Sequence, residues 1–359
     1  METVGSVALF VAGIALVVIV LDSALRTFVL PRGVVVRFTR FISVLVRKVF
    51  DLRLHWARTY EARDRAMALY GPIAMFALVI VWLALVLSGF TMIFVSVEDV
   101  GWREAFIQSG SSMFTLGFEP PIGFWAATLG FAEAAIGLGV LALLIAYLPT
   151  IYGAFSRREV LVGHMSVRAG TPPSAVDLLR RAHLINKLDN LDDLWVEWQL
   201  WFAELEETHT SLPFVNFFRS PDANRSWITA SGAVLDAAAM VNSTIDQERQ
   251  PQASLCIRSG FTALRSISRF FRIPHPDDPA PDDPISITRD EWEQACRELE
   301  AVGVPLKADR DQAWRDFAGW RVNYDIPLVT LAGLLVAPYA PWSSDRSIPF
   351  RVTVMRRRS

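Results

Sequence analysis

The chain has 359 residues, of which 52% are hydrophobic and 20% charged, and its formal net charge is −2. The apolar excess is concentrated in about the first 155 residues, which excludes a simple soluble enzyme, a disordered chain and a small disulfide scaffold. The near-neutral charge excludes a global attraction to nucleic acid. Cys256 and Cys296 lie far apart without metal-type spacing, as is typical of reduced cytosolic cysteines.

Three stretches are long and apolar enough to cross a membrane. They are residues 3–21, 66–97 and 120–155, and the third contains a single charged residue, Glu133. A spanning helix needs about 20 apolar residues to cross a hydrocarbon core of about 30 Å. The first stretch lacks the basic start and the cleavage site of a signal peptide. The sequence therefore predicts three transmembrane helices, the first of them a peripheral helix within residues 1–30.

The charges of the loops predict the orientation. The segment from Arg26 to Arg65 carries ten Lys/Arg and three Asp/Glu, so the positive-inside rule places it in the cytoplasm. The segment from Glu98 to Glu119 carries one arginine and four acids and belongs outside. The third helix ends at Arg157-Arg158, again on the cytoplasmic side. We expect a plasma-membrane protein with its N-terminus outside and its C-terminal domain inside.

An amphipathic helix is predicted in the loop between the first two spans, within residues 31–65. Its apolar side chains recur at helical spacing: Phe38, Phe41, Ile42, Leu45, Val49, Leu52 and Trp56. Its basic side chains cluster on another face: Arg37, Arg40, Arg47, Lys48 and Arg58. Such a helix lies in the headgroup plane with its basic side toward anionic lipid. The alternative is a helix packed on the C-terminal domain.

The segment from Gly101 to Pro121 is too polar to span and too apolar for an exposed loop of its length. It predicts a short helix from Trp102 to about Phe114, followed by an extended run that dips into the membrane and returns. Non-helical backbone at that depth is tolerated where it is buried in protein or lines a water-filled cavity. Near its end stand Thr115, Leu116, Gly117 and Phe118.

These four residues resemble the T-V-G-Y core of the potassium-channel signature, and residues 34–155 resemble the pore module of that cation-channel superfamily. The resemblance implies that the carbonyls of residues 115–118 replace the hydration shell of K⁺ or Na⁺. Gly117 permits the unusual φ that such a column needs. One such loop cannot enclose an axis, so the resemblance also implies a homotetramer. The alternative is an extracellular hairpin with a structural turn at Gly117.

The segment departs from the potassium-channel pattern in three ways. Glu119 stands where those channels have glycine, Pro120-Pro121 stiffens the exit, and serines and Gly110 occupy the place of the usual aromatic pair of the pore helix. The Glu119 position resembles the T-x-G-E pattern of weakly selective cyclic-nucleotide-gated channels. We therefore expect conduction of monovalent cations with a carboxylate ring at the outer mouth, rather than strict selectivity for potassium.

The third span is expected to form the inner helix. Gly137 and Gly139 offer a point for bending, and Pro149 offers a second because proline removes a helical hydrogen bond. The apolar residues that follow them are Leu144, Leu148 and Ile151. These residues either form a hydrophobic constriction or contact neighbouring helices or lipid. Intramembrane Glu133 supports the pore helix through Ser109 or Ser112, lines the cavity and attracts cations, or is a protonated structural hydrogen-bonder.

Residues 156–359 predict a helical cytoplasmic domain. Amphipathic helices are expected over 174–190 and 191–207, with the Trp195, Trp198 and Phe202 stripe in the core, and Thr288 with Glu291 forms a capping box. Residues 274–287 are expected to be an acidic, proline-rich linker. The stretch from Ile326 to Pro341 is expected to be a buried or interfacial helix, because a fourth crossing would place Arg356, Arg357 and Arg358 outside.

The sequence thus predicts an all-α membrane protein that acts as a tetrameric cation channel, gated by the inner helix and the cytoplasmic domain. No dinucleotide fingerprint, Walker loop or His/Cys metal set is present, so no enzymatic role and no cofactor beyond the conducted ions is expected. No regulatory ligand can be named. The competing hypothesis is a non-conducting membrane sensor or scaffold that keeps a pore-loop architecture.

Overall fold

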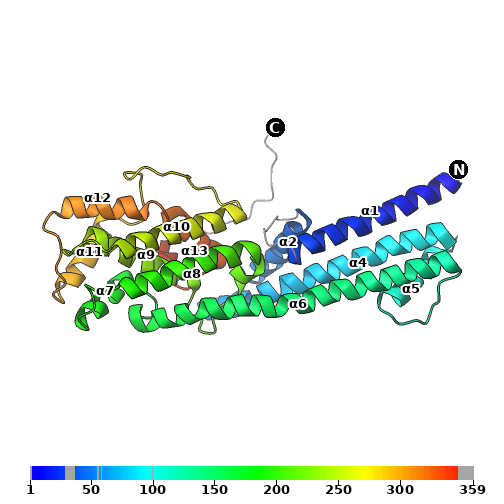
Figure 1. Cartoon of the computed structure of the whole chain (residues 1–359), viewed down its shortest axis with the longest axis horizontal. Coiled ribbons are helices and arrows are strands. Elements are labelled where there is room, and N and C mark those ends of the chain that lie inside the picture. Colours follow the sequence, from blue (N-terminus) through cyan, green and yellow to red (C-terminus); the bar gives the residue numbers. More distant parts are fainter. Residues whose placement is uncertain (1, 29–36, 55, 58, 99, 347–359) are drawn as a thin grey trace. The chain divides into compact units, whose positions relative to one another are not determined.

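A computed structural model describes residues 2–28, 37–54, 56–57, 59–98 and 100–346. These residues form helices and connecting loops, with one isolated β-bridge between Ile245 and Leu306. The chain divides into two compact units (Figure 1). Unit 1 comprises residues 1–52 and 70–152, and unit 2 comprises residues 53–69 and 153–359. Residues 53–69 therefore group with the C-terminal helices.

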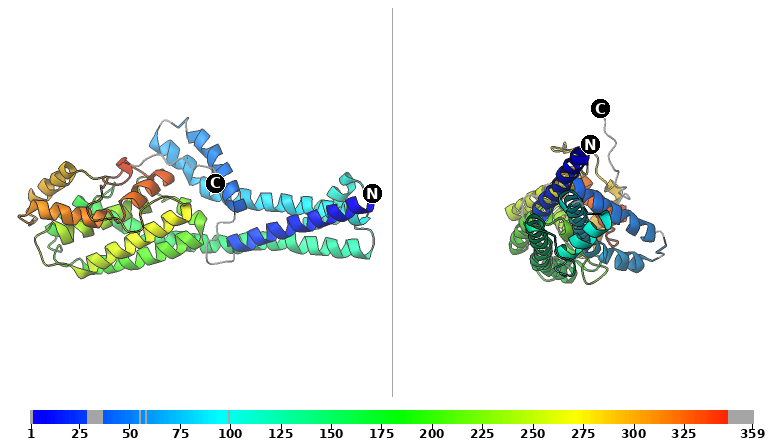
Figure 2. Two further views of the ribbon diagram at one scale, coloured as in Figure 1. Left: turned by 90° about the horizontal axis from the view of Figure 1, so that it is seen from above. Right: turned by 90° about the vertical axis from the view of Figure 1, so that its right-hand side faces the viewer.

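Unit 1 contains the long apolar helices. Its elements are α1 (Glu2–Phe28), α2 (Arg37–Leu54), α4 (Tyr70–Glu98), α5 (Trp102–Met113) and the first part of α6 (Phe124–Ala169). Figures 1 and 2 show α1, α4 and α6 running alongside one another. Three helical segments are long and apolar enough to cross a membrane, which confirms the predicted number: Val4–Phe28, Tyr60–Glu98 and Phe124–Ala169.

Glycine brings α1 and α4 into backbone contact. A Cβ atom on Gly13 would lie 2.6 Å from the Gly89 carbonyl oxygen, and a Cβ atom on Gly89 would lie 2.8 Å from a Val17 methyl group. Small residues at a crossing allow the close approach on which helix association in lipid depends. The first span is thus held against the second by a tight glycine crossing.

Helix α2 forms as predicted and packs within unit 1. Tyr70, the first residue of α4, donates a hydrogen bond to the Ser43 carbonyl oxygen at 3.2 Å and packs edge-on against Phe50. The outer face of α2 is apolar and exposed, as an interfacial helix requires. Its exposed apolar residues are Phe41, Leu45, Val49 and Leu52.

One predicted lipid contact is wrong, because Arg47 is buried. Its Nε lies 2.8 Å from Asp51 Oδ1 and its guanidinium lies 5.5 Å from the centre of the Tyr70 ring. Because the Arg47 side chain is buried in these contacts, it does not face lipid. Lys48 is exposed, whereas the side chain of Arg37 and all of Arg58 lie outside the described residues.

Unit 2 is a helical domain built around one buried helix. All residues of α9 (Trp227–Ser243) are buried. The surrounding elements are α3 (Tyr60–Ala68), the second part of α6, α7 (Ala175–Leu184), α8 (Asp192–Ser211), η1 (Pro213–Phe217), α10 (Pro251–Phe271), α11 (Arg289–Glu300), α12 (Arg310–Arg321), α13 (Asp325–Leu335) and η2 (Ser344–Arg346). The small side chains of α9 allow neighbours to approach it closely from every side.

A fully buried charge network ties α9 to the C-terminal helices. Arg321 Nη1 lies 2.6 Å from Asp236 Oδ1, and Arg321 Nε lies 2.7 Å from Asp325 Oδ1. Tyr324 donates to Asp236 at 2.9 Å, and Arg321 Nη2 donates to the Trp342 carbonyl at 2.7 Å. Arg321 is 0% exposed, so it stabilises the fold only because each buried charge has a partner.

Arg158 anchors the second part of α6 in unit 2. Its Nη1 donates to the Val215 carbonyl at 2.9 Å and lies 3.2 Å from His209 Nε2, and its Nη2 donates to the Phe218 carbonyl at 2.7 Å. Burial, together with the nearby Arg158 charge, holds the pKa of His209 well below its usual range. Neutral His209 therefore accepts the hydrogen bond from Arg158.

Several predictions for the C-terminal half are confirmed. The stripe of Trp195, Trp198 and Phe202 is buried in the core. The capping box of Thr288 with Glu291 opens α11. Helix α7 is shorter than the expected helix over 174–190, and helix α8 is longer than the expected helix over 191–207. The apolar helix α13 is buried in unit 2, whereas Arg356–Arg358 lie outside the described residues.

Candidate functional site: the segment between α5 and α6

Helix α5 lies in the position predicted for the short helix and runs back along its neighbours. Helix α5 begins shortly after the end of α4. Gln108 of α5 donates a hydrogen bond from its Nε2 to Oε1 of Glu98, the last residue of α4, at 2.5 Å. The last residue of α5, Met113, packs against Gly137. Gly137 lies about 20 Å along α6 from Phe124, at 1.5 Å per residue. The residues from Phe114 to Gly123 therefore return over this length to the start of α6.

Gly137 makes this packing possible. A Cβ atom at Gly137 would lie 2.7 Å from the Met113 carbonyl oxygen and 2.9 Å from Met113 Cγ. Because real Cβ atoms do not approach backbone oxygen so closely, any larger residue must push α5 away. Gly139 has open space around it. The structure thus gives Gly137 a packing role, and the bending role that the sequence suggested stays a prediction.

Glu133 lies behind α5, fully buried within the chain. Its Oε1 is 2.5 Å from Ser109 Oγ, and Ser109 Oγ also lies 3.1 Å from the Leu87 carbonyl oxygen. The Ser109 hydroxyl has one proton, so it donates to only one of these two oxygens. When Glu133 is protonated, it donates to Ser109 Oγ while Ser109 donates to the Leu87 carbonyl, and both contacts are then hydrogen bonds. The placement fits the supporting role that the sequence suggested through Ser109, and the cation-attracting role stays a prediction.

Helix α5 ends in a Schellman motif at the predicted filter. Leu116 N–H donates to the Ser111 carbonyl at 2.8 Å, and Thr115 N–H donates to the Ser112 carbonyl at 3.0 Å. Thr115 occupies the left-handed position with φ 55°, a place that glycine usually takes. A β-branched residue there costs about 1–2 kcal/mol. The residues after α5 therefore begin as a turn, in contrast to the extended run that was expected.

The turn leaves backbone carbonyls pointing away from α5. A trans peptide places its C=O opposite its N–H. Because the N–H groups of Leu116 and Gly117 face Ser111, the carbonyls of Thr115 and Leu116 face outward. Glu119 N–H donates to Ser111 Oγ at 3.1 Å, so the Phe118 carbonyl also faces outward. Among the residues that the structure describes, none donates a hydrogen bond to these carbonyls.

The side chains of the same turn are exposed in the single chain. Phe114 is 50% exposed, Leu116 62% and Phe118 61%. Glu119 is exposed as well. Gly117 has a φ of 70°, and a Cβ atom there would meet nothing within 4 Å. Apolar side chains so exposed beside long apolar helices need lipid or protein to cover them.

The predicted gate residues of α6 differ in exposure. Leu144 and Ile151 are 6% and 1% exposed, on the face turned toward the rest of unit 1. Leu148 is 38% exposed, and Pro149 is exposed within the helix. Leu144 and Ile151 therefore pack inside their own chain, whereas Leu148, one turn after Leu144, lies at the more exposed edge of the same side of α6. A constriction formed by these residues stays a prediction.

Sequence reasoning missed Ser111, the residue that organises the turn. Its side chain and its carbonyl together accept hydrogen bonds from Leu116, Gly117 and Glu119, and it is 1% exposed. The signal available in the sequence was a hydroxyl residue two positions before the last residue of a short helix. A residue at this position regularly accepts a backbone hydrogen bond from the turn that ends the helix. The hydrogen bond from Glu119 N–H to the Ser111 side chain depends on the path of the following loop, which the sequence does not show.

Paired glycine substitutions test the packing of α5 against α6. We expect Gly137→Ala to destabilise the folded protein by about 1–3 kcal/mol, because the new methyl group overpacks against Met113. Gly139→Ala, two residues away in open space, should stabilise the helix by about 0.5–1 kcal/mol. Thermal unfolding of the purified full chain in detergent measures both. Equal midpoints for the two variants would contradict the close approach of α5 to α6.

Comparison with known proteins yields one distant relative. No family model and no solved structure matches the chain. The chain is 22% identical over 241 residues to the uncharacterized membrane protein YdjJ of Bacillus subtilis strain 168, covering 61% of this chain and 67% of the relative. This similarity and the three long apolar helices agree that the chain is a membrane protein.

Proposed function

We propose that the chain is the subunit of a homotetrameric channel for monovalent cations in the plasma membrane. The K⁺ or Na⁺ ions pass the backbone carbonyls of residues 115–118, with Glu119 at the outer mouth. The observation that carries the proposal is that the carbonyls of Thr115, Leu116 and Phe118 face away from α5 without a donor among the described residues. Backbone carbonyls beside membrane-spanning helices require a partner, and a cation in transit is one.

The charge distribution of α5 supports a cation at this place. The helix macrodipole puts about half a negative charge at the C-terminal end of a helix. In α5 that end is Met113, directly before the turn, and it has no basic residue in its last turn. Glu119 adds a carboxylate at the exit of the segment. Both features favour a cation and disfavour an anion.

The exposed apolar surface and the geometry of coordination support a tetramer. One turn offers carbonyls on one side only, so a full coordination shell needs several copies around an axis. The exposed face of α6 is apolar along its length and is available for contact with other copies or with lipid. Its residues include Phe131, Leu138, Ile145, Leu148 and Tyr152.

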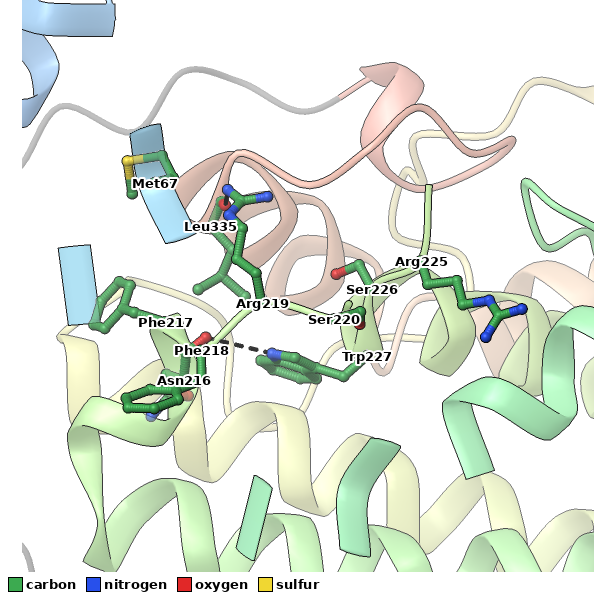
Figure 3. A pocket seen from close by; sticks show the side chains of 10 residues that line it. All are labelled: Met67, Asn216, Phe217, Phe218, Arg219, Ser220, Arg225, Ser226, Trp227 and Leu335. Atoms are coloured by element: carbon green, nitrogen blue, oxygen red, sulfur yellow. Dashed lines mark hydrogen bonds between the residues drawn. The ribbon is translucent and has the colours of Figure 1, made fainter. Parts of the chain in front are cut away.

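Unit 2 is proposed to be cytoplasmic and to control opening, and Arg219 supplies a link to the second span. Arg219 Nη1 lies 2.7 Å from Asp64 Oδ1 of α3, and Arg219 Nη2 donates to the Val336 carbonyl at 3.0 Å. Figure 3 shows Arg219 near Met67 of α3 and Leu335 of α13. Helix α3 directly precedes α4 in the sequence, so the role proposed for this clamp is to control the second candidate span.

Ion flux from reconstituted vesicles tests the proposal. We expect purified full-length protein in potassium-loaded vesicles to release K⁺, and Na⁺ more slowly, with native mass measurement giving a tetramer. A vesicle permeability equal to that of protein-free vesicles, with the tetramer intact, would favour the sensor hypothesis. A monomer or dimer would contradict the shared axis.

Breaking the clamp should change gating without removing conduction. We expect Asp64→Asn to alter the open probability by about fivefold, since a charged hydrogen bond contributes about 1.5–3 kcal/mol and part of it is retained by Asn. Asp222→Asn is the matched control, because it loses a half-exposed ion pair with Arg225 in the same loop. Single-channel recording decides: identical open probability in wild type and Asp64→Asn removes the clamp from gating.

A non-conducting sensor or scaffold is the second candidate. The observation that favours it is the Schellman turn, in which Leu116 and Gly117 N–H groups close onto Ser111 instead of forming an extended column. A turn of this kind also serves as a structural cap of α5. Both candidates predict the same fold, so the fold does not separate them. The flux measurement does, because only the channel releases ions.

A further inference from the structure

A cavity of about 170 Å³ in unit 2 has no role in the function proposed above. It lies between the first turn of α7, one face of α11, Asp236 of α9 and the segment that follows α13. Its lining residues include Ser174, Asp236, Glu291, Gln294, Glu298 and Trp342.

Asp236 forms the buried floor of this cavity and is 1% exposed. The hydrogen bonds from Arg321 at 2.6 Å and Tyr324 at 2.9 Å both go to Oδ1. Within the described part of the chain, no residue donates to Oδ2. Oδ2 is not among the fully buried side-chain atoms without a partner, which fits an oxygen that opens onto the cavity. Because Asp236 lines the cavity, a molecule inside it can supply the missing donor.

The surroundings of the cavity carry more negative than positive charge. At the floor, one guanidinium, Arg321, is shared between Asp236 and Asp325. At the rim, one guanidinium, Arg346, is shared between Glu291 and Asp345.

Glu298 adds a further carboxylate at the cavity's exposed mouth. It accepts a hydrogen bond from Gln294 Nε2 at 3.1 Å, which brings no charge. The excess of carboxylates attracts a cation. The first turn of α7 adds backbone N–H groups but no full positive charge to offset it.

The remaining wall suits an organic cation rather than a metal ion. Trp342, Pro341 and Ala295 give it an apolar side, and an indole ring attracts an ammonium group as well as packing against methylene groups. Among the described residues, no three His, Cys, Asp or Glu side chains gather as metal ligands. We propose that this cavity binds a small aliphatic amine, with its ammonium group at Asp236 Oδ2 and Glu298 and its methylene groups against Trp342.

Titration calorimetry on the purified full chain in detergent tests this, with 1,4-diaminobutane as the cationic probe and glycine as the zwitterionic control. We expect the diamine to bind and Glu298→Gln to weaken it by about tenfold, the effect of losing one charged contact. Asp290→Asn is the matched control, since Asp290 lies on α11, is exposed and does not line the cavity. It should bind as the wild type does.

Ala295→Leu fills the cavity without changing its charge and should abolish binding, with helical content checked by circular dichroism. If this variant does not fold, Glu298→Gln decides alone. The proposal is overturned if the diamine gives no binding heat up to about 10 mM, if glycine binds equally well, or if Glu298→Gln binds as tightly as the wild type. Since binding is measured without ion flux, a negative result here leaves the channel proposal standing, and the reverse also holds.

Discussion

Gly117→Ala is expected to reduce potassium flux from reconstituted vesicles to the level of protein-free vesicles while the tetramer remains intact. Gly117 has a φ of 70°, a region that costs an alanine about 1–2 kcal/mol. In four copies this amounts to about 4–8 kcal/mol against the turn that directs the carbonyls outward. The added methyl group meets nothing within 4 Å, so folding and assembly are not expected to suffer from steric overlap.

Gly123→Ala is the matched control for this experiment. Gly123 lies in the same connection, has a φ of 88°, and is equally open around its Cβ position. It stands outside residues 115–118, so its strain should leave most of the flux. Wild-type flux through tetrameric Gly117→Ala, or an equal loss in both variants, would remove Gly117 from the permeation path.

Arg321→Met is expected to destabilise unit 2 by about 3–5 kcal/mol, because it leaves Asp236 and Asp325 as buried carboxylates without their shared cation. Burial raises the pKa of Asp325, but Arg321 and Ser286 outweigh it and hold this pKa below its usual range. Without Arg321 the opposing effect of burial prevails. For a unit of this size the unfolding midpoint should fall by on the order of 10 °C.

Thermal unfolding of the full chain, followed by far-ultraviolet circular dichroism, measures this loss, and hydrogen exchange in α9 locates it. Arg289→Met is the control, since Arg289 pairs with Glu293 and Asp311 at the surface. Exposed ion pairs contribute about 0–1 kcal/mol, so its midpoint should hardly change. Equal midpoints for Arg321→Met and wild type would show that the buried network contributes nothing to stability.

Local patterns were sufficient for most of the helices. Uncharged length alone predicted the three long apolar helices, since their number depends on composition along the chain and not on packing. Helix α5 followed from its polarity between two apolar stretches, and the start of α11 followed from Thr288 and Glu291, whose contacts are only three residues apart. The buried tryptophan stripe of α8 followed from its helical spacing.

Tertiary contacts decided what periodicity does not contain. The sequence showed Arg47 on a basic helical face, but only packing reveals that Asp51 and Tyr70 occupy it. The sequence predicted a hinge at Gly137, but only packing reveals the close approach of Met113 to it. The pairs Asp64–Arg219 and Asp236–Arg321 join residues far apart in the sequence, so no local pattern signals them.

The sequence by itself thus determined the helical membrane class and the place of the candidate pore segment, because hydrophobic length and short-range caps act within one element. Only the tertiary structure decided which carbonyls of that segment face outward, since their direction depends on Ser111 and on the seat of α5 against α6. Burial likewise selects one partner for each charge, because an unpaired charge inside a protein is too costly to keep.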